Sequence, residues 1–276
     1  MVCVADINYA FAKSQQMTCC ENKKVTLYFQ GDIVMGYTYN IQVEFDKTEL
    51  DNIKKRGEKI YAFRAVKTSQ DSGRPLVWQI FDVISDDGFT VQWNVENGAY
   101  YSYHKITPNS NYLTEKTYPT QFGQVLNIDE INIATVIDGE DKSAISIFNG
   151  FTSEYVCGIS QKDKDDNFVP VCAFPLWPNH LDIIVPIEKV ALIVATPVQK
   201  TATVYEVSRG PGIFIDLTTD NLKNRKIKYD SSGWHVTDGL GHAVPFDAKA
   251  SMSHLLIDLD TTLISTLKNR LLSKNG

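Results

Sequence analysis

The sequence predicts an all-β protein: a two-sheet antiparallel β-sandwich that ends in an amphipathic α-helix. Short runs of β-branched and aromatic residues recur at intervals of roughly 8 to 15 residues, separated by clusters of Gly, Pro, Asn and Asp. Apolar and polar residues alternate through residues 37–45, which is typical of a strand with one buried face in an antiparallel sheet. No helical pattern of about 10 to 15 residues separates the runs, so a parallel sheet of βαβ units is disfavoured.

The strand-like runs continue from Val25 to Trp234. Because large open sheets curl or split, so many strands favour two packed sheets. We expect strands at residues 25–29, 37–45, 60–66, 77–84, 89–95, 99–104, 131–136, 144–148, 155–159, 183–185, 190–195, 203–207, 213–217 and 226–229. Glycine-containing turns at residues 86–88, 209–212 and 230–233 predict hairpins between the strands on either side, since glycine readily adopts positive φ.

Two segments depart from the strand pattern. Residues 48–58 are polar and charged with Gly57 near their end, which predicts a short helix or loop capping one end of the sandwich. Residues 251–273 predict a long helix that Ser251 or Ser253 caps. Its leucines recur at three-to-four spacing and form an apolar stripe: Leu255, Leu256, Leu259, Leu263, Leu267 and Leu271. We expect this stripe to lie across the sandwich, and a homo-oligomer contact is the alternative.

The pattern divides the chain into an N-terminal segment with the first strand (1–36), a β-sandwich body (37–247) and a helical tail (248–276). Residues 58–65 and 188–195 resemble each other, both beginning Glu-Lys and continuing as an apolar strand. This echo leaves open a body made of two similar halves, at about residues 25–130 and 131–237.

Composition excludes several classes of protein. The 276 residues are 43% hydrophobic and 22% charged, with a net charge of −6, as in ordinary globular chains. The acidic balance and the lack of a basic stripe argue against nucleic-acid binding. The sequence has neither a secretory signal nor an apolar run long enough for a transmembrane helix. We therefore expect a cytoplasmic protein, or a secreted one only if a signal peptide has been removed from the numbering.

Cysteine and histidine usage indicates no metal or redox cofactor. The five cysteines are odd in number, and the adjacent Cys19 and Cys20 lack further ligands at zinc-site spacing. The motifs of nucleotide-binding loops, zinc peptidases and serine hydrolases are missing from the chain. A catalytic His-carboxylate pair would have to come from His180 with Asp182 or from His235 with Asp238. The simpler interpretation of each pair is two polar residues at the end of a strand.

Two aromatic segments are the best candidates for ligand recognition. Residues 94–103 combine three polar residues with three tyrosines: Asn94, Glu96, Asn97, Tyr100, Tyr101 and Tyr103. Residues 174–180 hold Trp177 between two prolines, close to His180. Flat rings stack on sugar faces while polar neighbours orient hydroxyl groups, and stiff loops lose less entropy on binding. The alternative is that these rings simply pack in the core or at its rim.

The densest acidic loop provides the main candidate metal site. Asp163, Asp165 and Asn167 alternate in a way that could supply oxygen ligands to Ca²⁺. The loop lacks the glycine and the bidentate glutamate of an EF-hand, and Lys162 and Lys164 offset its charge. A solvated hairpin tip is therefore the simpler interpretation, and no cofactor is expected beyond this calcium alternative.

Several short motifs resemble a group of uncharacterised all-β proteins found in fungi. They are Gly73-Arg74-Pro75-Leu76-Val77-Trp78, Val91-Gln92-Trp93, Asn97-Gly98-Ala99-Tyr100-Tyr101-Ser102 and Pro186-Ile187-Glu188-Lys189-Val190. The resemblance covers roughly residues 37–235. It implies an all-β fold and carries no function or site residues with it.

Three functional hypotheses follow from these patterns. The leading one is a non-catalytic β-sandwich binding protein, lectin-like or a defence protein, acting on glycans or membrane surfaces through its aromatic loops. The second is a self-assembling structural or storage protein joined as a homo-oligomer by the C-terminal helix or by sheet edges. The third is a hydrolase or isomerase using a His-carboxylate pair.

Overall fold

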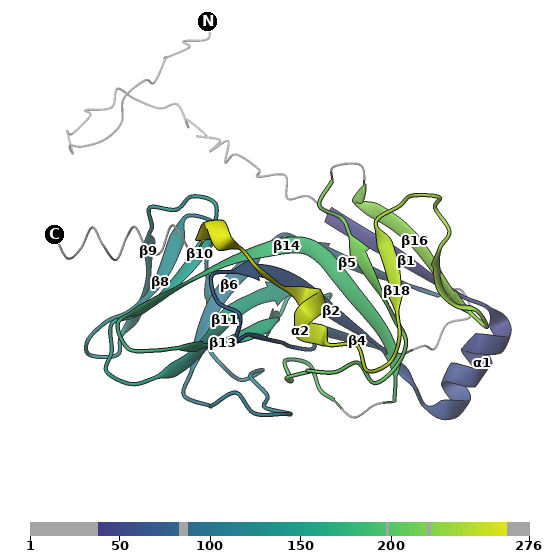
Figure 1. The fold of residues 1–276 in the computed structure, drawn as a ribbon, viewed down its shortest axis with the longest axis horizontal. Helices are drawn as coiled ribbons and strands as arrows, with labels where there is room; N and C mark the ends of the chain where they lie inside the picture. Colours follow the sequence, from purple (N-terminus) through teal and green to yellow (C-terminus); the bar gives the residue numbers. More distant parts are fainter. Residues whose placement is uncertain (1–37, 83–87, 197–198, 220–221, 264–276) are drawn as a thin grey trace, which may run out of the picture. The chain divides into compact units, whose positions relative to one another are not determined.

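Strands dominate the computed structural model, which describes residues 38–82, 88–196, 199–219 and 222–263 (Figure 1). In this described part the strands form three sheets. The four-stranded sheet has the order β17 (Gly233–Val236), β16 (Asn224–Asp230), β1 (Thr38–Phe45), β5 (Phe89–Asn94). The six-stranded sheet has the order β3 (Arg74–Pro75), β13 (Cys172–Leu176), β11 (Tyr155–Lys162), β6 (Asn97–Ser102), β7 (Thr117–Pro119), and β12 (Phe168–Pro170) pairs with β11.

The nine-stranded sheet is built around β14, the long curved strand of Figure 1. Its main order is β18 (Ala243–Phe246), β15 (Gly212–Asp216), β14 (His180–Ala195), β10 (Ile145–Asn149), β8 (Gln124–Ile128), β9 (Ala134–Asp138). On the other side of β14 lies β2 (Lys59–Thr68), which also pairs with β4 (Gln79–Phe81) and β19 (Ile257–Leu259). A register shift between Ile187 and Val190 marks a bulge in β14. Because bulges bend strands, β14 can pair with β10 near its start and with β15 near its end.

The all-β, sandwich-like fold is confirmed, with two corrections to its details. The described sheets number three, and pairing is mixed, since β1 with β16, β8 with β10, and β2 with β19 are parallel. One core cluster joins all three sheets, with Ile41, Phe174 and Leu192 among its fully buried members. Two sheets would leave part of this apolar surface uncovered, so the third sheet completes the core.

Local signals located several elements correctly. Helix α1 (Lys47–Arg56) begins after Asp46, whose carboxylate accepts the Thr48 amide at 2.9 Å, and ends at Gly57 with φ of 64°. Leu50 and Ile53 bury one face of α1. The 230–233 turn joins β16 to β17 as a hairpin, confirming that prediction.

The other two predicted hairpins are wrong. Strand β4 pairs with β2 and strand β5 with β1, so the strands on either side of residues 86–88 enter different sheets. Residues 203–207 form only isolated bridges, to Leu76, Asn111 and Ser251, and do not pair with β15. Long-range partners offered these segments more buried contact than their neighbours in sequence did.

The C-terminal tail is not the single helix that its leucines suggested. Helix α2 (Met252–Leu256) stops after five residues, β19 follows, and residues 261–263 are helical again. Strand β19 pairs with Val66, Lys67 and Thr68, where β4 leaves the edge of β2 open. Hydrogen bonding to the backbone groups on this edge of β2 stabilises the chain more than continuing the helix would. Met252 and Leu256 nevertheless cover the second face of the sheet, against Tyr61 and Phe63.

The two echoing segments pair with each other. In the β2–β14 ladder Ala62 lies opposite Leu192, and these two residues hold the same position in the echo. Pairings such as β1 with β16 and β6 with β11 also cross residue 130, so residues 25–130 and 131–237 are not separate sheet modules. The predicted strand at 25–29 and Cys3, Cys19 and Cys20 lie outside the described residues.

Candidate functional site

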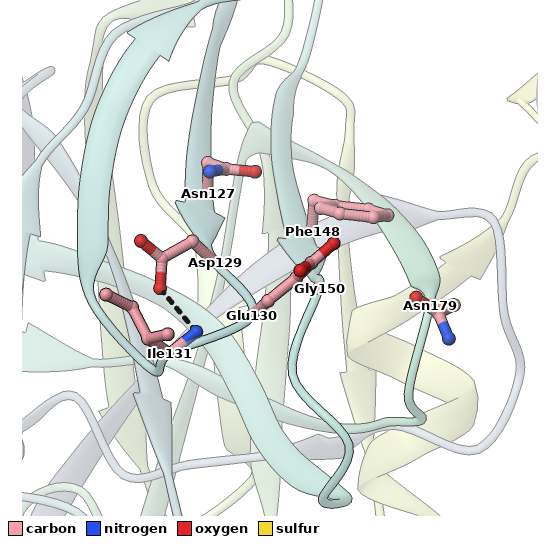
Figure 2. A pocket seen from close by; sticks show the side chains of 7 residues that line it. All are labelled: Asn127, Asp129, Glu130, Ile131, Phe148, Gly150 and Asn179. Carbon is pink, nitrogen blue, oxygen red and sulfur yellow. Dashed lines mark hydrogen bonds between the residues drawn. The ribbon is translucent and has the colours of Figure 1, made fainter.

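A pocket of about 500 Å³ opens where β8, β10 and the β13–β14 turn meet. Figure 2 shows its side chains, which combine amides and carboxylates with one aromatic ring. We call it the amide pocket, and its lining residues are Asn127, Asp129, Glu130, Ile131, Phe148, Gly150 and Asn179. They come from three segments of the chain that the sheet brings together.

Strand pairing sets the floor of the amide pocket. Asn127 on β8 lies directly beside Phe148 on β10 in the parallel register, so their side chains share one face. Gly150 follows β10, and a Cβ there would lie 2.8 Å from the Ile128 carbonyl oxygen. Only glycine therefore permits this close approach of the loop to β8.

A buried asparagine fixes the loops around the pocket. Asn149 is fully buried; its Nδ2 donates to the Ser153 and Leu176 carbonyls at 2.8 and 3.3 Å, and its Oδ1 accepts the Phe151 amide at 3.0 Å. The Asn149 carbonyl accepts the amide of Asn179 at 2.7 Å. These bonds hold the 150–153 loop and the β13–β14 turn in place, so the pocket is formed before any ligand arrives.

The β8–β9 turn is equally constrained. Asp129 Oδ1 accepts the backbone amides of Ile131 and Ile133 at 3.0 and 2.8 Å, the first of which is drawn in Figure 2. Asn132 adopts the left-handed conformation with φ of 64°, which asparagine tolerates. The turn leaves Ile131 74% exposed, beside Glu130. The pocket thus has two acidic side chains and no basic one among its lining residues.

A second pocket, of about 310 Å³, lies at the end of the six-stranded sheet. We call it the basic pocket; it is lined by Ser72, Arg74, Tyr103, His104, Lys105, Ile106, Glu154, Tyr155, Val156 and Pro175. Arg74 donates through Nε to Glu206 at 2.7 Å, and His104 Nδ1 lies 2.9 Å from Glu115. The Lys105 ammonium has no partner in the described part of the chain.

Tyrosines form one wall of the basic pocket. Tyr155 meets Tyr101 and Tyr103 edge-on, with ring centroids 5.2 and 4.9 Å apart. Burial raises the pKa of Tyr101 to about 12 and also raises the pKa of Tyr155. Both hydroxyls therefore stay protonated near neutral pH and act as neutral hydrogen-bonding groups.

The structure separates the residues that sequence patterns grouped together. Tyr100 is fully buried and donates to the Cys172 carbonyl at 2.8 Å, so it does not reach the surface. Its neighbour Tyr101 faces the other side of β6, beside the basic pocket, as strand alternation requires. Asn97, which accepts from Gln161 at 2.9 Å, lies at the opposite end of β6, about 13 Å from Tyr101 along the strand.

Asn94 and Glu96 also lie away from both pockets. Asn94 ends β5 and accepts the Thr38 hydroxyl at 2.7 Å, and Glu96 pairs with Lys162 at 2.6 Å. Trp177 and His180 do lie beside the amide pocket, because they flank Asn179 in the same turn. Trp177 is 44% exposed and meets the His180 ring edge-on at 5.6 Å.

The acidic loop at residues 163–167 forms the tip of the β11–β12 hairpin. Asp163 Oδ1 accepts the backbone amides of Asp165 and Asn167 at 2.9 and 3.0 Å, and Asp165 pairs with Lys164 at 2.7 Å. These carboxylates therefore stabilise the turn itself. In the described ranges, no group of three or more His, Cys, Asp or Glu side chains is placed to hold a metal ion.

Neither His-carboxylate pair considered from the sequence forms. Asp182 is buried and interacts with Ser69, Gln70 and Cys157, whereas His180 is exposed. His235 lies 3.3 Å from Asp230, and Asp238 pairs with Arg225 instead. Cys157 and Cys172 are free and buried.

Sequence reasoning missed Asn127, Asp129, Glu130 and Phe148. For Asp129 and Glu130 the signal was the Asp-Glu-Ile-Asn run at residues 129–132, where an isoleucine stands among turn-forming polar residues, but the strand predicted at 131–136 included Ile131. Comparison of the chain with protein-family models, with curated proteins and with solved structures finds no match. None of the helices in the described ranges is long and apolar enough to span a membrane.

Proposed function

We propose that this chain is a non-catalytic binding protein that holds a carbohydrate in the amide pocket. The observation that carries the proposal is the pairing of Asn127 and Phe148 on one face, opposite Asn179 and beside the acidic turn. Amides both donate and accept hydrogen bonds and carboxylates accept them, which matches the hydroxyl groups of a sugar. The Phe148 ring offers a flat apolar surface for the C–H face of a pyranose.

Rigidity and exposed apolar side chains support the same proposal. The loops are held by Asn149 and Asp129, so binding costs little ordering entropy. Ile131 and Trp177 extend the apolar surface beyond the pocket, at 74% and 44% exposure. Exposed aromatic and aliphatic side chains beside a polar pocket are typical of recognition sites.

Self-assembly through the C-terminal helix has less support. Met252, Leu256 and Leu263 are 0%, 1% and 7% exposed, because they pack on sheet residues of the same chain. They are therefore unavailable for joining copies unless the tail lifts away.

A glycan array probed with the labelled full chain tests the proposal. We expect binding to a subset of glycans and an at least tenfold loss in the Asn127→Ala/Glu130→Ala double variant, whose two side chains have no partner in the described residues. Gln92→Ala removes an exposed amide on β5 and should change nothing. If the chain binds no glycan on the array, or if the folded double variant binds as tightly as wild type, the proposal is overturned. Circular dichroism checks that the variant is folded.

A further inference from the structure

Asn132 connects the amide pocket to the basic pocket. It follows Ile131, which lines the amide pocket. Its Oδ1 accepts the Tyr155 hydroxyl at 2.9 Å and its Nδ2 donates to the Tyr103 hydroxyl, and both tyrosines line the basic pocket. Residues 131 and 132 of one turn therefore link the linings of the two pockets.

A second connection joins the pockets through β13. Pro175 lines the basic pocket and Asn179 the amide pocket, four residues apart in the chain. The Gln70 amide donates to the Pro175 carbonyl at 3.2 Å and to Asp182 at 2.7 Å, which anchors this strand end to the sheet behind it. The segment from Pro175 to Asn179 therefore contributes to both pockets.

Their charges differ in sign. The amide pocket contains Asp129 and Glu130 and no basic residue among those that line it. The basic pocket contains Arg74, His104 and Lys105 against one carboxylate, Glu154. Arg74 and His104 are paired with Glu206 and Glu115, which leaves the Lys105 ammonium as a cation with no partner in the described part of the chain.

We infer that the ligand is an acidic oligosaccharide: a neutral sugar unit occupies the amide pocket and a carboxylated sugar unit occupies the basic pocket. This inference rests on the proposed function. Lys105 and Nη2 of Arg74, which has no hydrogen-bond partner among the described residues, bind the carboxylate, and charge-assisted bonds of this kind are stronger than neutral ones. The Tyr103 ring, 62% exposed, packs on the sugar, and the Tyr155 hydroxyl stays neutral.

The test compares a uronic-acid oligosaccharide with its carboxyl-reduced counterpart, using titration calorimetry on the full chain. We expect the acidic form to bind at least tenfold tighter, and the preference to shrink as salt rises. Lys105→Ala should abolish the preference while leaving affinity for the neutral form unchanged. Lys55→Ala, which removes an exposed lysine on α1, is the matched control and should keep the preference.

The outcomes separate this inference from the proposed function. The acidic-ligand inference is wrong if wild type binds the acidic and the carboxyl-reduced oligosaccharide equally, or if Lys105→Ala keeps the preference for the acidic one. Carbohydrate binding in the amide pocket still stands in either case if Asn127→Ala/Glu130→Ala weakens the binding of both oligosaccharides. If neither oligosaccharide binds, saturation-transfer NMR with glucuronate and glucose tests whether the basic pocket binds a carboxylated sugar by itself. Selective glucuronate binding that Lys105→Ala removes supports a carboxylate site in the basic pocket. No glucuronate binding overturns the acidic-ligand inference.

Discussion

Arg64 is buried, although arginine side chains are mostly exposed. Its side chain is fully buried, with the guanidinium 4.5 Å from the Trp93 ring centroid and 5.4 Å from that of Trp78. Arg64 Nη2 lies 2.5 Å from Glu188 Oε2, and Trp93 donates to the same oxygen at 3.0 Å. The bulge in β14 places Glu188 where it can reach this pair. A buried arginine needs such a partner, because desolvating an unpaired charge is costly.

Glu188→Gln should therefore be strongly destabilising. The substitution leaves the arginine charge unmatched in the core, and we expect the free energy of unfolding to fall by about 3 kcal/mol in urea titrations. Adding Arg64→Met should recover much of the loss, since the double variant leaves no buried charge. Lys164→Ala, which breaks an exposed ion pair with Asp165, is the control and should have little effect. Equal effects of Glu188→Gln and Lys164→Ala would contradict this account of the core.

At the scale of elements, the tail shows how pairing competes with helix propensity. The leucine spacing marked Leu256 and Leu263, which are 1% and 7% exposed, but also Leu259, which is 43% exposed, while Leu267 and Leu271 lie outside the described residues. It did not predict that residues 257–259 extend along the edge of β2. A helix there would leave backbone groups of Val66 and Thr68 without a strand partner on that edge.

Leu256→Ala tests the packing of this tail. Leu256 belongs to the cluster with Tyr61, Phe63 and Met252, so truncation leaves a cavity and should cost about 3 kcal/mol of unfolding free energy. Leu259→Ala is the matched control, because Leu259 is 43% exposed, and should cost much less. Chemical denaturation of the two variants provides the comparison. Equal losses would show that burial does not distinguish these two leucines.

At the scale of the whole molecule, Asp182 connects two sheets. It lies on β14 of the nine-stranded sheet and contacts Cys157 on β11 of the six-stranded sheet, with Ser69 and Gln70 donating to it at 3.1 and 2.7 Å. Burial raises the pKa of its carboxyl to about 6, although those hydrogen bonds act in the opposite direction. Between the unfolded pKa of about 4 and this value, the folded protein holds a proton that the unfolded chain has lost.

The contribution of Asp182 to stability therefore decreases as pH rises from about 4 to about 6. The shift corresponds to about 3 kcal/mol of unfolding free energy, with the stabilising effect fully present below pH 4. Asp182→Asn cannot titrate, so its urea-unfolding profile over pH 4 to 7 should decline less than that of wild type. Asp166→Asn, at an exposed position that already has φ of 62°, should follow wild type. Parallel profiles for wild type and Asp182→Asn would show that Asp182 does not titrate in this range.

Features whose causes are local could be predicted from the sequence. Alternation predicted β1, β-branched and aromatic runs predicted strands that overlap β5 and β6, the Asp46 and Gly57 caps enclose the predicted helix, and the glycine at 233 closes the predicted hairpin. These signals succeed because side-chain period, cap hydrogen bonds and positive φ depend on residues within a few positions of one another.

Which strands pair and which polar residues meet could be seen only in the folded structure. Runs next to one another in sequence, such as β4 and β5, enter different sheets because a buried partner far along the chain can offer more contact than a neighbour. The amide pocket joins residues 127–131, 148–150 and 179, and the basic pocket joins residues 72–74, 103–106, 154–156 and 175. Such convergence depends on sheet register and loop closure, which no single segment encodes.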